Sequence, residues 1–282
     1  MPPFNPHPVL AAVLVALAVW HVRSVAGESR RRALLAWIVL ALVTLWPIGD
    51  LASSVSLSIA TAQRLVIMLG VAPLLLTSTS TLQLVRLTRP APVDAVTRRL
   101  AHPGAALVFV TLVGTVTLST PVVDEGAHSS LVRAATLLLV LLCGIVLWVP
   151  ALGVLPGARR LSPVGRAGFL FASSLVVTSM SFVWIFSTHS LYPALHGQEA
   201  LLHVTPVFDQ QLAGFVAKLG AFIPMWSASF VVFSRAVDAG DHVEESPLHW
   251  ADVERQLLRV DRQRARWSRR HANTGEGAGP QE

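Results

Sequence analysis

Seven apolar runs, each long enough to cross a lipid bilayer, constrain the fold of this chain more than any other feature. They lie at about residues 8–25, 33–51, 55–79, 104–122, 130–153, 167–188 and 210–233. A hydrocarbon core of about 30 Å requires roughly 20 mostly apolar residues per helix, and the hydrophobic share of 53% exceeds that of typical soluble domains. The sequence therefore predicts an all-α, polytopic membrane helix bundle with about seven transmembrane helices.

The segments between the runs alternate in charge. Arginines follow the first, third and fifth runs, at Arg23, Arg30, Arg31, Arg32, Arg86, Arg89, Arg98, Arg99, Arg159, Arg160 and Arg166. The segments after the second, fourth and sixth runs contain neither Arg nor Lys. Because positively charged segments stay in the cytoplasm, we expect the N-terminus outside and the C-terminus in the cytoplasm.

The composition changes after the last run, so the chain divides into residues 1–236, the seven-span transmembrane domain, and residues 237–282, a cytoplasmic tail. In the tail, apolar side chains at helical spacing lie beside arginines: Trp250, Val253, Leu257, Val260 and Trp267, with Arg255, Arg259, Arg262, Arg264 and Arg266. This pattern predicts a basic amphipathic helix, which lies on anionic headgroups or docks a partner. The terminal segment NTGEGAGPQE is typical of disorder.

The net charge of +6 does not indicate nucleic-acid binding. The arginines lie between apolar runs and in the tail, where membrane topology explains them, so we expect no nucleic-acid partner. Cys143 is the only cysteine, which excludes a disulfide framework. The sequence contains no phosphate-binding glycine loop and no His-Glu-x-x-His zinc signature. We therefore do not expect an enzyme.

Charged residues inside the apolar runs are the first candidates for a functional site. Arg64 lies near the middle of the third run, where an Arg costs roughly 2.5–3.5 kcal/mol on insertion scales and therefore needs a partner inside the bundle. Asp209, at the start of the last run, is the expected anion for Arg64. Lys218 lies further along the same run, at a similar depth. These groups either fix helix packing or form a functional polar site.

Histidine and sulfur side chains are the candidate metal ligands. The predicted outer segments carry His128, His189, His196 and His203, and the apolar runs carry Met68, Cys143, Met180 and Met225. Imidazole is a common copper and zinc ligand, and thiol and thioether groups suit Cu(I). His128, His203 and Cys143 are therefore the candidate ligands, and the alternatives are solvated loop histidines and sulfur groups that only pack.

Five strings along residues 35–235 resemble a known family. They are AQRLVIMLGVAPLLL in the third run, GIVLWVPALGVLP followed by RRLSPVGR at the fifth, and then SLYPA and FDQQLAG. On these motifs the chain resembles the CtaG family of cytochrome c oxidase assembly factors. The resemblance implies a multi-pass protein of the bacterial inner (plasma) membrane, in contact with lipid and with oxidase subunits, that supplies copper during maturation of the haem–copper subunit.

The resemblance also maps the family's polar positions onto this chain. Members of the family typically carry two histidines one turn apart in the third span and a second pair early in the fifth. Here Ala60 and Arg64 occupy the first pair of positions, and Arg133 and Leu137 occupy the second. The residues that carry over are Asp209, Gln210 and Gln211. A fixed positive charge at Arg64 opposes copper binding, which implies a divergent member with a scaffolding role.

Two other classes of function fit the same features. In a small transporter for an anionic solute, Arg64 and Lys218 would line a polar cavity. The spans show no internal repeat and no paired broken helices, which counts against that class. In a non-catalytic membrane scaffold, the basic tail would recruit a partner.

Overall fold

The computed structural model describes residues 7–155, 161–195 and 198–241. Within these residues the chain forms helices and no strand. In chain order the α-helices are α1 (Pro8–Ser24), α2 (Gly27–Thr44), α3 (Ile48–Asp50), α4 (Leu57–Leu65), α5 (Ala72–Ser78), α6 (Thr81–Thr88), α7 (Ala91–Leu100), α8 (Pro103–Thr117), α9 (Thr120–His128), α10 (Ser130–Leu152), α11 (Pro163–Val177), α12 (Ser179–Phe186) and α13 (Pro206–Asp241). Three short π-helical segments are η1 (Leu51–Val55), η2 (Val66–Val71) and η3 (Gln198–Leu202).

The described part of the chain contains four to six candidate membrane spans. Four continuous segments are long and apolar enough to cross a membrane: Leu57–Ser78, Ser130–Leu152, Pro163–Phe186 and Pro206–Val237. Two further candidates are helix pairs: Gly27–Thr44 with Ile48–Val55, bent by 55°, and Ala91–Leu100 with Pro103–Thr117, bent by 94°. The all-α membrane fold is thus confirmed, whereas the count of seven and the orientation of the termini stay predictions.

Proline and helix length account for the difference from seven uniform spans. Pro103 begins α8 after His102, whose backbone is extended, because the residue before a proline disfavours the helical conformation. The predicted run at 104–122 is broken, since α8 ends at Thr117 and Pro121 lies in the first turn of α9. The first run forms α1, which is apolar but has 17 residues and is shorter than the other candidates.

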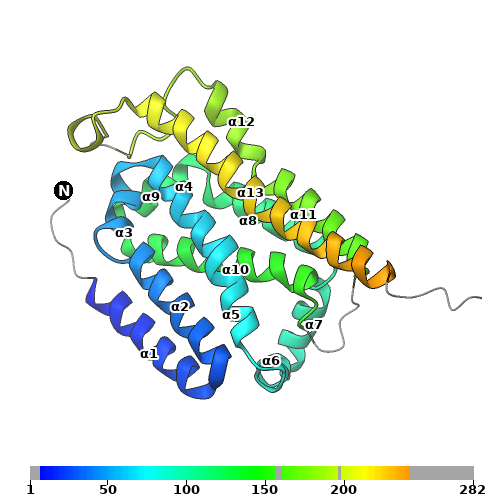
Figure 1. Cartoon of the computed structure of the whole chain (residues 1–282). Helices are drawn as coiled ribbons and strands as arrows, with labels where there is room; N and C mark the ends of the chain where they lie inside the picture. Colours follow the sequence, from blue (N-terminus) through cyan, green and yellow to red (C-terminus); the bar gives the residue numbers. More distant parts are fainter. Residues whose placement is uncertain (1–6, 156–160, 196–197, 242–282) are drawn as a thin grey trace, which may run out of the picture. The chain divides into compact units, whose positions relative to one another are not determined.

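Helix α10 lies at the centre of the main hydrophobic core, between α5, η2, α8 and α11 (Figure 1). Its Gly144 permits this packing, because a Cβ there would lie 2.7 Å from the Cβ of Ala72 and 2.8 Å from the Met68 carbonyl oxygen. One turn further along, the Trp148 indole donates a 3.0 Å hydrogen bond to the same Met68 oxygen. The π-helical segment η2 therefore contributes a main-chain acceptor to the helix interface.

Large apolar side chains cover the outer faces of several helices. On α8, Val108 and Leu112 are 59% and 61% exposed, and on α13 Ile223 and Phe230 are 60% and 70% exposed. A water-facing surface rarely carries so much contiguous apolar area, whereas a lipid-facing surface requires it. The exposed faces thus agree with the candidate spans.

The chain divides into two units, Met1–Ser234 and Arg235–Glu282. The helices described above, apart from the end of α13, belong to the first unit. The predicted amphipathic helix and the terminal segment of the tail lie outside the described residues, so both stay predictions.

Candidate functional site

Arg64 is held at the end of a neighbouring helix. It is the eighth residue of α4, is half-buried, and donates from Nη1 to Thr117 Oγ1 at 3.0 Å and from Nη2 to the Thr117 carbonyl at 2.7 Å. Thr117 is the last residue of α8, and the final carbonyls of a helix have no partner within it. The guanidinium therefore caps α8 and complements the negative end of its dipole.

Asp209 is held at the start of α4. The side chain accepts hydrogen bonds from the Ser56 hydroxyl at 2.7 Å, the Ser58 hydroxyl at 2.5 Å and the Leu57 backbone N–H at 2.6 Å. Its exposed fraction is 1%. Ser56 is the N-cap of α4, so the buried carboxylate is stabilised by hydroxyl donors and by the positive end of a helix dipole.

The ion pair predicted between Arg64 and Asp209 does not form. The two groups lie near opposite ends of α4, because Leu57 and Arg64 are separated by about 10 Å of helix rise. Each charge instead finds the end of a helix, Asp209 at the start of α4 and Arg64 at the end of α8. Helix termini act here as the partners that a carboxylate and a guanidinium would otherwise supply to each other.

The two glutamines after Asp209 form hydrogen bonds with the segment between α12 and η3. Gln210, 1% exposed, accepts from the Leu191 N–H at 2.8 Å and donates to the His189 carbonyl at 3.2 Å. Gln211 makes a longer contact of 3.5 Å with the Ser187 carbonyl. The Asp-Gln-Gln string therefore joins α13 to α4 on one side and to residues 187–191 on the other.

Tyr192 holds the same segment near the end of α8. Its hydroxyl donates to the Leu118 carbonyl at 2.7 Å and accepts from the Trp184 indole at 3.1 Å. Burial raises the pKa of the Tyr192 phenol above its usual value, so the group stays a neutral donor in the physiological range. The SLYPA motif thus contacts the FDQQLAG motif through the Leu191–Gln210 hydrogen bond and contacts the residue after α8 through Tyr192.

Lys218 is separate from the Arg64 site. Its Nζ lies 4.4 Å from the centroid of the Phe182 ring, a cation–π contact, and it lines neither of the two cavities described below. Arg64, Lys218 and the Asp-Gln-Gln string therefore do not form one polar site, although they were grouped as such from the sequence.

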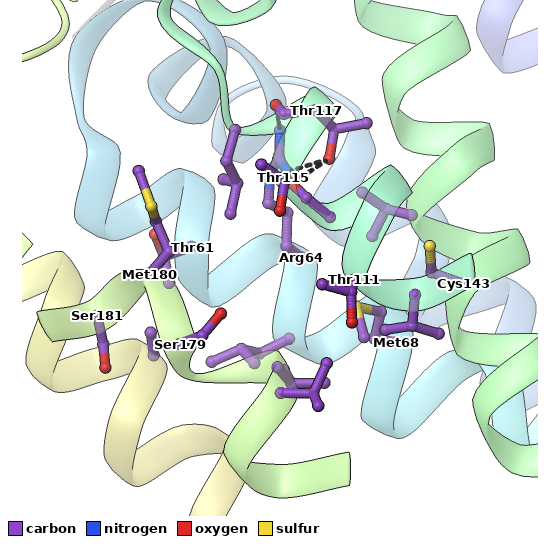
Figure 2. Close-up of a pocket in the computed structure, with 18 of the residues that line it drawn as sticks. Thr61, Arg64, Met68, Thr111, Thr115, Thr117, Cys143, Ser179, Met180 and Ser181 are labelled. Atoms are coloured by element: carbon purple, nitrogen blue, oxygen red, sulfur yellow. Dashed lines mark hydrogen bonds between the residues drawn. The ribbon is translucent and has the colours of Figure 1, made fainter. Parts of the chain in front are cut away.

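Two cavities adjoin Arg64. The larger, of about 100 Å³, lies between α4, η2, α8, α10, α11, α12 and α13 and is shown in Figure 2. The smaller, of about 60 Å³, lies between η1, α4, α9 and α10. Arg64 and Thr61 line both cavities. In Figure 2 the guanidinium points to Thr117 and away from Met68 and Cys143.

The four positions that the family resemblance singled out all line the smaller cavity. Its lining includes Ala60 and Arg64 from α4 and Arg133 and Leu137 from α10. The lining residues include no imidazole, thiol or carboxylate, which are the groups that bind copper. The residues present in this cavity therefore do not fit a copper ion.

The candidate metal ligands lie apart. His128 is exposed at the end of α9, where Nδ1 donates to the Asp124 carbonyl at 2.8 Å, and His203 is exposed. Cys143 is buried in α10 and lines the larger cavity with Met68 and Met180. Within the described residues, no group of three or more His, Cys, Asp or Glu side chains could hold a metal ion.

A buried carboxylate that the sequence did not single out lies beside the smaller cavity. Asp50 Oδ1 accepts from His7 Nε2 at 2.8 Å and from Arg133 Nη1 at 3.1 Å. Asp50 is 8% exposed, and its other oxygen has no partner among the described residues. The position of this acid at the end of the apolar run 33–51 is the signal that could have found it.

The fold and this site define a helical membrane protein whose polar groups are gathered around helix ends within the bundle. A family model described as cytochrome c oxidase caa3 assembly factor (Caa3_CtaG) matches residues 13–239. The chain belongs to this family, which confirms the resemblance found on its motifs. Comparisons with curated proteins and with solved structures give no match.

Proposed function

We propose that this protein acts in the maturation of the haem–copper subunit of cytochrome c oxidase, as a membrane-embedded scaffold that contacts oxidase subunits. The family match over residues 13–239 is the observation that carries the proposal. The scaffold would be a multi-pass protein of the bacterial plasma membrane with seven spans, counting α1 and both bent pairs, its N-terminus outside and its C-terminus in the cytoplasm. The alternation of arginine-rich and arginine-free segments supports that orientation.

Scaffolding is favoured over copper delivery by the charges at the family's histidine positions. Arg64 and Arg133 line the cavity that these positions share, and two fixed positive charges oppose a cation. The hydrogen bonds of Asp209 and Gln210 also support a scaffolding role, because they hold three parts of the chain together. A rigid bundle with a defined surface is what a scaffold for another membrane protein requires.

Transport of an anionic solute is not favoured. That function needed Arg64 and Lys218 on one cavity, and Lys218 instead lies over the Phe182 ring. Candidate metal binding by His128, His203 and Cys143 is likewise not favoured, because the structure places them on separate elements.

Deletion of the gene, with and without added copper, tests the proposal. Oxidase spectra and cytochrome c oxidase activity should both fall in the deletion strain, and added copper should not restore them. Restoration by copper would assign the protein to copper delivery instead of scaffolding. Normal oxidase in both conditions would contradict a role in assembly altogether.

A further inference from the structure

The smaller cavity carries two positive charges and no negative one on its wall. Arg64 reaches it from α4 and Arg133 from α10, while the remaining lining residues are apolar or neutral. The carboxylate of Asp50 binds Arg133 but does not itself line the cavity. The wall as described therefore has an excess of positive charge.

The charge of Arg64 is not neutralised by an acid. Within the described residues, its two hydrogen bonds both end on Thr117, a neutral residue. Among the described residues, no carboxylate oxygen lies within 4.0 Å of its guanidinium nitrogens. An intramembrane guanidinium pairs with an acid or with backbone carbonyls; the partners of Arg64 are the carbonyl and hydroxyl of Thr117, which leave its net charge in place.

Arg133 is neutralised only in part. It shares a single oxygen of Asp50 with His7, and its Nε donates to the Gly126 carbonyl at 3.4 Å. Its Nη2 makes no hydrogen bond within the described residues. Thr136, one turn further along α10 and also on the cavity wall, has a hydroxyl without a partner among the same residues.

The volume of the cavity fits a small group. Its volume is about 60 Å³, and roughly 10–15 Å³ is enough for one water molecule, so a group of four or five heavy atoms can enter. Arg133 and Arg64 lie roughly 5 Å and 11 Å along their helices from the first residue. Arg133 therefore lies near the beginning of its candidate span, and Arg64 lies deeper within its own.

We propose that this cavity is a binding site for an oxyanion group, which Arg64 and Arg133 hold from two sides and to which Thr136 donates. Guanidinium groups suit this role because their planar donors match the oxygens of phosphate and carboxylate. The oxyanion comes either from a free anion in solution or from the headgroup of an anionic phospholipid. The site does not rest on the role in oxidase assembly, since it follows from the cavity and its charges.

Binding of two phosphorus probes to the purified full-length protein tests the site. In a non-ionic detergent, titration calorimetry with inorganic phosphate and with dihexanoyl phosphatidic acid should show saturable binding of at least one probe. Arg64→Gln and Arg133→Gln should each weaken that binding at least about tenfold, because a hydrogen bond to a charged group is lost. Lys218→Gln is the matched control, since it removes an intramembrane cation that lies outside the cavity.

Asp50→Asn gives a test with the opposite sign. This substitution removes the carboxylate that competes with the ligand for Arg133, so probe binding should become several-fold tighter. Thermal unfolding shows which variants fold. If Arg64→Gln does not fold, because α8 loses its cap, Arg133→Gln and Asp50→Asn still decide the outcome.

The two probes separate the sources of the oxyanion. Binding of inorganic phosphate that is sensitive to both arginines supports a site for a free anion, and binding of phosphatidic acid alone supports a lipid headgroup. Binding of neither probe overturns the proposal. Binding that is unchanged in Arg64→Gln and Arg133→Gln also overturns it.

Discussion

Asp209 accepts a 2.5 Å hydrogen bond from the hydroxyl of Ser58, across 151 positions of sequence. The bond joins the beginning of α13 to the first turn of α4, and the Ser56 hydroxyl and the Leu57 N–H complete the same contact. A single carboxylate thus fixes the relative position of two candidate spans at one end. The packing of the bundle around Arg64 depends on this contact, because Arg64 lies on the same short helix as the donors.

Substitution of Asp209 by Asn should destabilise the protein. The amide loses the negative charge at the helix N-terminus and presents N–H groups to donors, so we expect a loss of about 1–3 kcal/mol of unfolding free energy. The apparent unfolding temperature in detergent measures it. Asp124→Asn is the matched control, since within the described residues the Asp124 side chain accepts only a 3.4 Å contact from the Ala194 N–H. Equal stability of the two variants would contradict the anchoring role of Asp209.

Gln210 and Gln211 should differ in importance although they are adjacent. Gln210 is buried and makes two hydrogen bonds to residues 189 and 191, whereas Gln211 makes one contact of 3.5 Å. Gln210→Ala should leave the Leu191 N–H without its acceptor and cost about 1–3 kcal/mol. Limited proteolysis should then cleave near residue 190 faster in Gln210→Ala than in Gln211→Ala. The reverse order would show that the segment is held by other contacts.

Gly144 should tolerate no side chain. A Cβ at this position would lie 2.7 Å from the Ala72 Cβ and 2.8 Å from backbone atoms of Met68, so Gly144→Ala should cost about 1–3 kcal/mol by overpacking. Gly168→Ala is the control, because nothing lies within 4 Å of its ideal Cβ. In that open position alanine favours the helix. Thermal unfolding of the two variants should therefore shift in opposite directions.

Histidines placed at the family's positions should create a copper site in the smaller cavity. In Ala60→His combined with Arg64→His, two imidazoles one turn apart would face the smaller cavity, and the opposing charge of Arg64 would be gone. Metal analysis after copper loading should find about one copper per chain in this variant and only background in the wild type. No copper above background in the double variant would refute this account of the cavity.

The long helices could be predicted from the sequence because length and hydropathy alone decide whether a segment spans a bilayer. The runs at 55–79 and 130–153 correspond closely to the continuous segments Leu57–Ser78 and Ser130–Leu152. The run at 104–122 was predicted less well, because hydropathy does not register that Pro121 separates α9 from α8. The prediction fails where backbone geometry, rather than apolar content, ends a helix.

The sequence predicted residues of the candidate site but not which of them lie close together. Arg64 and Asp209 were identified as buried charges in need of partners, but the partner assignment was wrong because helix termini compete with side chains for both charges. The proximity of Arg133 to Arg64 depends on how α10 lies against α4, and the spacing of residues within each helix does not contain that information. Asp50 could have been singled out from its position at the end of an apolar run, but its contact with Arg133, across 83 positions, could not be predicted.

The π-helical segment η2 gives the span Leu57–Ser78 a rotational phase that its hydropathy does not encode. Each residue of an α-helix advances the side chains by about 100°, and a π-helical turn holds one residue more than the regular helix. Removal of one residue between Val66 and Val71 would leave the span equally apolar and still long enough to cross a bilayer. Because the π-helical turn absorbs its extra residue, the shortened span would close into a regular helix in which α4 and α5 keep their facing toward Thr117 and α10, whereas a deletion within α4 would turn everything after it by about 100°.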